Sequence, residues 1–297
     1  MKILYTSDIY GNSIKLQEFL GLHKSFNPTI SIINGNIFPY HQLNREEEIV
    51  ESIKIINQIA DKTKLYIQFG GDDFNLLYKK HLSAFINVTD LTNSIESFNE
   101  FTLMGINYCP NWWVQERKDW TLRDGRFYKQ YVDASQGMIS DESNIYQIKN
   151  LESHLLSKPT IGEVIEKKLK KIEDIEKTIL VTCVPPVGLG LDASQEYLHW
   201  GSYSIRRLVE GDFTNGNQPM ICFSSGFRES TRNTKNAVHE LDKCVCFNCG
   251  QSDVALSYIV VDLSGNGISR AQHSLYPMKS HRRFDLPLAN IPDLEKL

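Results

Sequence analysis

The chain has 297 residues, of which 41% are hydrophobic and 23% charged, and its formal net charge is −4. This composition supports a sizeable core, and the slightly acidic balance argues against a broad nucleic-acid-binding face. No apolar run reaches the roughly 20 residues that a membrane span needs, so we expect no membrane association. The 6 cysteines do not suggest a secreted disulfide framework, so we expect a cytoplasmic protein.

The N-terminal part alternates short apolar strands with amphipathic helices. Strands are predicted at 3–6, 29–33 and 64–69, and helices at 13–22 and 46–60. Such alternation is typical of a mainly parallel sheet. Each of these strands stops at a polar segment, and ligands gather beyond the carboxyl ends of parallel strands. We therefore expect three loops that are distant in the sequence to meet at one site.

The rest of the chain is less regular. Residues 105–150 are rich in aromatic and charged residues, which predicts either an insertion packed over the rim of the site or a platform for a partner. One charged helix is predicted at 157–177, and another helix follows residues 201–202. Strands are predicted at 178–182, 220–223, 243–247 and 255–263, the last two antiparallel if a hairpin joins them. We expect a single domain over 1–297, with a C-terminal extension at 271–297.

Five polar segments carry the functional information. In chain order they are 7–12 (SDIYGN), 34–36 (NGN), 70–73 (GGDD), 181–186 (VTCVPP) and 225–230 (SGFRES). Their order and spacing resemble the calcineurin-like metallophosphoesterases over about residues 1–270. The resemblance implies an α/β protein, a two-layer mixed β-sandwich flanked by helices. It also implies a site where active relatives hold two metals, which activate a water for attack on phosphorus.

Carried over residue by residue, the resemblance implies that this site has lost most of its metal ligands. Asp8 keeps the first aspartate, whereas Tyr10 stands where a histidine would be. Asn36 stands where an aspartate would bridge the two metals, which are typically roughly 3.5–4 Å apart. An amide lacks the negative charge that such a bridge supplies.

The later segments show similar changes. Gly71 stands at a liganding asparagine, and Asp72 at the histidine that would assist catalysis as a general acid. Asp73 keeps the closing aspartate of its segment. The three remaining histidine positions hold Cys183, Phe227 and Glu229.

These replacements favour a catalytically degenerate protein that acts as a binding, scaffold or regulatory subunit. We expect its partner to be another protein that binds through the aromatic insertion, and we expect no cofactor. Degenerate members of the family look like scaffolds. One alternative is a phosphoesterase acting on a phosphomonoester, phosphodiester or nucleotide, with a single Mg, Mn or Zn ion in a remodelled site. Its ligands would be Asp8, Asn36, Asp72 and Glu229. Another alternative is a nucleotide or phosphate sensor, and Asp73 and Arg228 are its candidate ligand-binding residues.

The cysteines near the C-terminus allow two interpretations. Cys244, Cys246 and Cys249 lie within six residues of one another and could bind zinc, with a further ligand from elsewhere. Buried, reduced cysteines are the favoured interpretation. The scattered histidines, including His199, are interpreted as surface or packing residues because no partner carboxylate is apparent.

Overall fold

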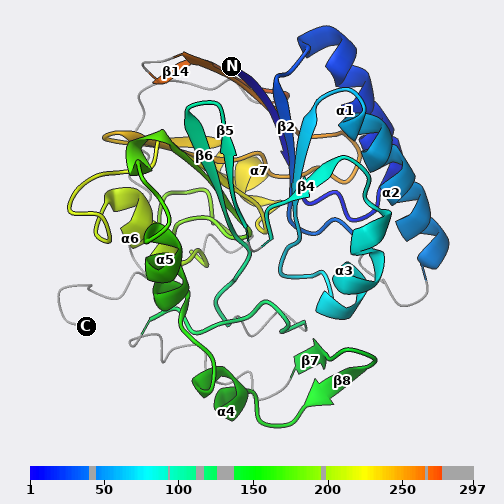
Figure 1. Ribbon diagram of the computed structural model, residues 1–297, viewed down its shortest axis with the longest axis vertical. Coiled ribbons are helices and arrows are strands. Elements are labelled where there is room, and N and C mark those ends of the chain that lie inside the picture. Colours follow the sequence, from blue (N-terminus) through cyan, green and yellow to red (C-terminus); the bar gives the residue numbers. More distant parts are fainter. Residues whose placement is uncertain are drawn as a thin grey trace.

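The computed structural model describes residues 1–39, 45–92, 94–111, 117–125, 137–194, 199–264 and 267–275. Within these residues, two six-stranded sheets pack face to face and helices cover their outer faces (Figure 1). This is the two-layer mixed sandwich that the sequence predicts. None of the described helices is both long and apolar enough to cross a membrane.

The first sheet has a parallel centre, as predicted, and two antiparallel strands at one edge. Its strand order is β14-β13-β1-β2-β3-β4. The four parallel strands are β1 (Lys2–Ser7), β2 (Ile30–Asn34), β3 (Lys64–Gln68) and β4 (Val88–Asp90). The antiparallel pair is β13 (Ile259–Ser264) and β14 (Gly267–His273).

Two amphipathic helices cover the outer face of this sheet, and both are predicted from the sequence. In α1 (Ser13–Phe26), the side chain of Asn12 accepts the Lys15 backbone N–H and so caps the first turn. In α2 (Glu46–Ala60), isoleucines at helical spacing are buried against the sheet. β1, β2 and β3 are buried on both faces, because the opposite face of this sheet packs on the second sheet.

The second sheet has the order β11-β12-β10-β9-β6-β5, with parallel inner strands and an antiparallel strand at each edge. Its strands are β5 (Ile95–Phe98), β6 (Phe101–Ile106), β9 (Thr178–Thr182), β10 (Ile221–Ser224), β11 (Val238–Leu241) and β12 (Cys244–Asn248). Helices α5 (Ile161–Leu169) and α6 (Tyr203–Glu210) pack their apolar residues on its outer face.

Two details differ from the predicted elements. β12 and β13 do not form a hairpin, because they lie in different sheets, and the hairpin partner of β12 is β11. The helix predicted at 157–177 is interrupted. α5 begins at a capping box between Thr160 and Glu163 and ends at Leu169, and a short 3₁₀ turn, η4 (Ile175–Lys177), precedes β9.

The central insertion packs over the rim of the site where it is described. Trp120 Nε1 donates to the Asp73 carbonyl at 2.6 Å, and the Arg117 guanidinium donates to the Asp72 carbonyl. Residues 117 and 120 thus contact the loop after β3, and the two interpretations of the insertion as a whole stay predictions. Trp112, Trp113, Phe127 and Tyr128 lie outside the described residues, as does most of the C-terminal extension.

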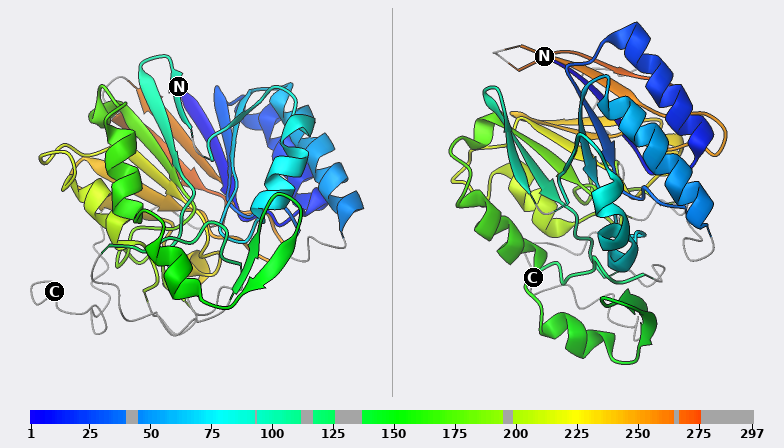
Figure 2. Two further views of the ribbon diagram at one scale, coloured as in Figure 1. Left: turned by 60° about the horizontal axis from the view of Figure 1, so that its bottom comes forward. Right: turned by 45° about the vertical axis from the view of Figure 1, so that its right-hand side comes forward.

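Smaller elements complete the chain. The hairpin of β7 (Gly137–Ser140) and β8 (Ile145–Ile148) lies with α4 (Leu151–Leu156) at one end of the molecule, beyond the two main sheets (Figure 2). The remaining short helices are α3 (Asn75–His81), η2 (Leu82–Ala84) and α7 (Ser230–Thr234). The single-domain organisation stays a prediction.

Candidate functional site

The loops that follow β1, β2 and β3 meet at the carboxyl ends of the strands, as predicted. Asn36 Nδ2 donates to Asp8 Oδ1 at 2.8 Å and to the Tyr10 hydroxyl at 2.9 Å. The Tyr10 hydroxyl donates in turn to Asp72 Oδ2 at 2.7 Å. The Asp72 backbone N–H donates to Asn36 Oδ1 at 2.9 Å, which fixes the orientation of the amide. Asn36 is thus the centre of a network that joins all three loops.

Unusual backbone geometry turns these side chains toward one another. Asp8, Tyr10 and Asn36 have φ angles of 53°, 50° and 46°, in the left-handed region. Asparagine and aspartate tolerate this region, but a bulky tyrosine seldom occupies it, and such residues are frequent at functional sites. Gly35 is required by close packing as well, because a Cβ there would lie 2.2 Å from Ser225 Oγ.

Asp8 is 2% exposed and surrounded by donors. Besides Asn36, it accepts from Ser7 Oγ at 3.0 Å and from the Gly226 backbone N–H at 3.1 and 3.2 Å. Burial raises the pKa of Asp8 to about 7; the hydrogen bonds oppose this shift and the neighbouring Asp72 charge adds to it. The protonated and ionised forms of Asp8 are therefore both populated near neutral pH.

This pKa predicts a pH-dependent contribution of Asp8 to stability. The pKa of Asp8 is about 7 in the folded protein and 3.8 ordinarily. Protonation of Asp8 therefore contributes its full stabilisation of the folded state below pH 3.8, and this contribution is lost as the pH rises through 7. Asn cannot ionise, so Asp8→Asn should not lose this contribution. We expect the unfolding free energy of Asp8→Asn minus that of the unmodified chain to be higher at pH 8 than at pH 4 by up to about 4 kcal/mol. Urea denaturation in EDTA at both pH values measures this change, and a constant difference would contradict it.

Asp73 holds two of the loops together. It is fully buried, and its carboxylate accepts the backbone N–H groups of Ile37, Phe38 and Gly70, each at 3.0 Å. Burial raises its pKa to about 6 despite these donors. Asp73 therefore ties the loop after β2 to the loop after β3.

Comparisons with known proteins identify the fold. No family model matches the chain, and no curated protein matches it either. Among solved structures, the protein TT1561 of Thermus thermophilus is 12% identical with a TM-score of 0.57, and the match covers 92% of this chain and 97% of that one. A dimetal phosphatase from Danio rerio is 8% identical with a TM-score of 0.52, over 93% and 99% of the two chains. A putative 5′-nucleotidase from Staphylococcus aureus is 9% identical with a TM-score of 0.50, over 94% of this chain and 55% of that one.

The chain has the calcineurin-like metallophosphoesterase fold. The positions at which the family resemblance implies metal ligands fall into two groups in this structure. The network described above brings Asp8, Tyr10, Asn36 and Asp72 together.

The other implied positions do not join that network through their side chains. Cys183 and Phe227 are 3% and 8% exposed and belong to the apolar cluster under α5 and α6. Gly71 has no side chain to offer. Glu229 is half-buried and lines a cavity next to Arg228, whose guanidinium lies 5.8 Å from the centre of the Tyr10 ring.

The cysteines near the C-terminus separate into two places. Cys244 and Cys246 are buried on the outer face of the second sheet with their sulfur atoms 3.9 Å apart, next to Cys222. Cys249 instead lies 3.2 Å from Ser7 Oγ, in the cluster between the sheets. In the described part of the chain, no group of three or more His, Cys, Asp or Glu side chains is arranged to hold a metal ion.

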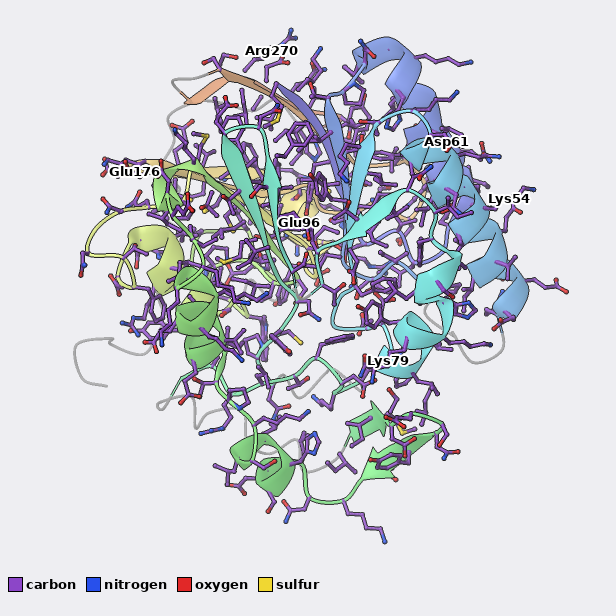
Figure 3. The ribbon with its side chains drawn as sticks, in the orientation of Figure 1. Lys54, Asp61, Lys79, Glu96, Glu176 and Arg270 are labelled. Carbon is purple, nitrogen blue, oxygen red and sulfur yellow. The ribbon has the colours of Figure 1, made fainter. Side chains whose placement is uncertain are left out.

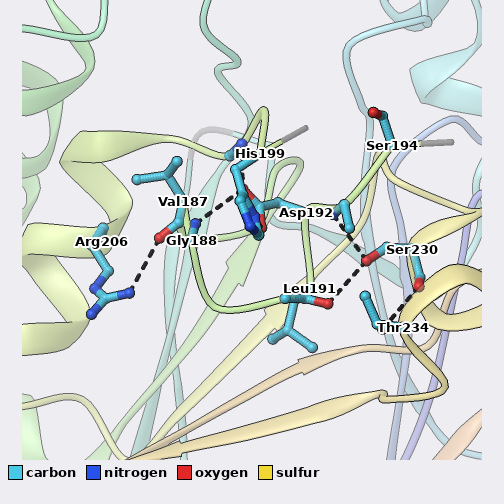
Figure 4. Close-up of polar contacts among 12 residues, drawn as sticks. Val187, Gly188, Leu191, Asp192, Ser194, His199, Arg206, Ser230 and Thr234 are labelled. Atoms are coloured by element: carbon cyan, nitrogen blue, oxygen red, sulfur yellow. Dashed lines mark hydrogen bonds and ion pairs between the residues drawn. The ribbon is translucent and has the colours of Figure 1, made fainter. Parts of the chain in front are cut away.

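His199, interpreted from the sequence as a surface or packing residue, has a carboxylate partner that the sequence did not reveal, because it pairs with a buried aspartate (Figure 4). Its Nδ1 lies 2.8 Å from Asp192 Oδ1, and this hydrogen bond raises the pKa of His199. Asp192 also accepts the backbone N–H groups of Gly188 and Gly201 at 3.1 and 2.9 Å. Ser230 Oγ connects the same loop to α7 by donating to Gly190 at 3.2 Å. The loop after β9 is thereby held against the segment that contains Arg228 and Glu229.

Sequence reasoning missed three buried polar residues beside the site. Gln68 Nε2 donates to Asn34 Oδ1 at 3.2 Å, below the network, and Asn107 is fully buried just after β6. Lys118 is fully buried, donates to Asn111 at 3.0 Å, and has its pKa lowered to about 8 by burial. A buried lysine gives no periodic signal in the sequence, so only the fold reveals it.

Proposed function

We propose that this chain is a catalytically degenerate protein of the metallophosphoesterase fold, whose site serves binding instead of phosphoester hydrolysis. The observation that carries the proposal is the direction of the Asn36 amide. Its nitrogen points at Asp8 and Tyr10, from the position at which the family resemblance implies a metal-bridging aspartate. An amide N–H donates hydrogen bonds and cannot ligate a cation.

The neighbouring oxygen atoms support the same conclusion. Asp8 accepts from Ser7, Asn36 and Gly226, and Asp72 accepts from Tyr10. Buried polar groups that are satisfied in this way need no cation to compensate them. The raised pKa of Asp8 further reduces the negative charge that would attract a divalent ion. The donor set therefore does not fit a pair of divalent metals.

We propose another protein as the partner and the cytoplasm as the location. All 6 cysteines are free and buried, which suits a reducing compartment. Within the insertion, Trp120 is 5% exposed and packs against Tyr78 and Tyr108, so this residue supports the rim and is not itself available to a partner.

Elemental analysis of the purified protein, combined with a generic phosphodiester assay in Mn²⁺, tests the proposal. We expect less than stoichiometric divalent metal and no turnover above that of Asp8→Ala, because the Asn36 network replaces the charges that two metals need. Stoichiometric metal together with turnover that disappears in Asp8→Ala would overturn the proposal in favour of a remodelled phosphoesterase.

A further inference from the structure

Two fully buried side chains beside the candidate site have amide atoms that are not hydrogen-bonded to any described residue. In Asn107 these are both Nδ2 and Oδ1, and in Gln68 it is Oε1. We infer that at least one internal water molecule binds between Gln68 and Asn107 and links the two sheets. The inference goes beyond the proposed function and does not depend on it.

The two side chains come from different sheets and lie near each other. Gln68 ends β3 in the first sheet, and Asn107 directly follows β6 in the second. Gln68 Nε2 donates to the Ile106 carbonyl at 3.4 Å, one residue before Asn107. A Cβ at Gly105 would lie 2.5 Å from Gln68 Oε1, so this oxygen atom lies against β6 two residues before Asn107. The Gln68 amide is therefore packed on the end of β6 that leads into Asn107.

Strand alternation directs Asn107 toward the first sheet. In β6, Leu103 belongs to the apolar cluster between the sheets, whereas Met104 and Ile106 belong to the cluster on the outer face. The odd-numbered positions thus face the first sheet, and Asn107 continues this alternation. Positions 105 and 107 are about 7 Å apart along the strand. A water molecule with a hydrogen bond of about 2.8 Å on each side spans the part of this distance that the Asn107 side chain does not cover.

The chemistry of the two amides suits water. Gln68 Nε2 donates to Asn34 Oδ1 at 3.2 Å, which fixes the amide orientation and leaves Oε1 as an acceptor. Asn107 offers both a donor and an acceptor. A water molecule that donates to Gln68 Oε1 can also accept from Asn107 Nδ2 or donate to Asn107 Oδ1, so either orientation of the Asn107 amide permits the bridge. Both side chains are neutral, and a buried ion would need a compensating charge.

A water molecule at this point satisfies atoms that would otherwise oppose folding. Buried polar groups nearly always have a partner, and an internal water typically makes about 3 hydrogen bonds to groups of this kind. The surroundings are already polar, because Asn34 Nδ2 donates to the Tyr5 hydroxyl at 3.1 Å and to the Thr182 carbonyl at 2.8 Å. The bridge from Gln68 to Asn107 extends this polar layer to β6 and joins the two sheets a second time.

A high-resolution crystal structure of the unmodified protein tests the inference directly. We expect an ordered water molecule within hydrogen-bond distance of Gln68 Oε1 and of one atom of the Asn107 amide. A direct hydrogen bond between the two amides, or electron density without a water molecule at this position, would overturn the inference. The result is independent of metal content and turnover, so it does not share its failure with the proposed function.

Urea denaturation of Asn107→Leu is a second test, in solution, because the sign of the effect depends on the water. If water joins the two side chains, Leu leaves Gln68 Oε1 without a donor, and the unfolding equilibrium constant should rise at least about tenfold. If the Asn107 amide is unsatisfied, Leu removes a penalty and the constant should fall.

Double variants supply the control for this measurement. The effects of Asn107→Leu and Gln68→Leu should be non-additive, because both remove the same bridge. The matched control is Gln218→Leu, at a buried glutamine just before β10 and therefore at the opposite end of the parallel strands. Its effect should add to that of Asn107→Leu. A fall in the unfolding constant of Asn107→Leu, or additive effects of Asn107→Leu and Gln68→Leu, would contradict the water bridge.

Discussion

Asn36→Asp is expected to lower the free energy of unfolding by about 3–5 kcal/mol in metal-free buffer. The amide nitrogen of Asn36 lies 2.8 Å from Asp8 Oδ1, and both side chains are almost fully buried. A carboxylate at that point would repel Asp8 and would lose the donor that satisfies Asp8 and Tyr10. Urea denaturation in EDTA measures the loss.

Divalent metal should partly reverse this effect. Two adjacent carboxylates, with Asp72 nearby, form an oxygen donor set that suits Mn²⁺, and an ion that binds only the folded state raises the apparent stability. The control is Asn36→Leu, which also removes the amide but adds no charge, so its stability should not respond to Mn²⁺. If Asn36→Asp is as stable as the unmodified protein in EDTA, the central role of the Asn36 amide is disproved.

Asp73→Ala is expected to cost about 3–5 kcal/mol of unfolding free energy and to loosen the site. The substitution leaves three buried backbone N–H groups, those of Ile37, Phe38 and Gly70, without their acceptor. Each such group costs about 1–3 kcal/mol when it is not satisfied. Urea denaturation near pH 7 measures the loss.

The control for Asp73→Ala is Asp61→Ala, at the exposed end of α2 (Figure 3). Surface substitutions of this kind usually change stability by no more than about 0.5 kcal/mol. Similar losses in the two variants would mean that Asp73 does not hold the loops together.

Local patterns predicted much of the first sheet but little of the middle of the chain. The isoleucines of α2 recur at helical spacing, and β1, β2 and β3 are short segments rich in isoleucine, leucine and tyrosine, so each element is evident from a short window. β4 and β5 are only half-buried edge strands of mixed composition. Their pairing with β3 and β6 depends on contacts that a short window does not contain.

The candidate site was likewise only partly predictable from the sequence. Tyr10, Asn36 and Phe227 differ from the residues that the family resemblance implies, and this is evident from the sequence alone. The separation of Cys249 from Cys244 and Cys246 was only partly predictable. Strand alternation predicts that Cys244 and Cys246 share one face of the sheet. Only the structure shows that the turn after β12 directs Cys249 between the two sheets.

The sequence by itself determined which chemical groups stand at the ends of the strands, since residue identity does not depend on folding. It therefore shows that none of the five polar segments contains a histidine, although the family resemblance implies imidazoles there. Only the tertiary structure decided how the remaining groups are used. The Asn36 amide points at Asp8 because the Asp72 backbone, which belongs to a different loop, orients it. The Gln251 backbone N–H donates to the Arg228 carbonyl because the loops after β10 and β12 meet. Hydrogen bonds depend on distance and direction in space, and packing of the two sheets sets both.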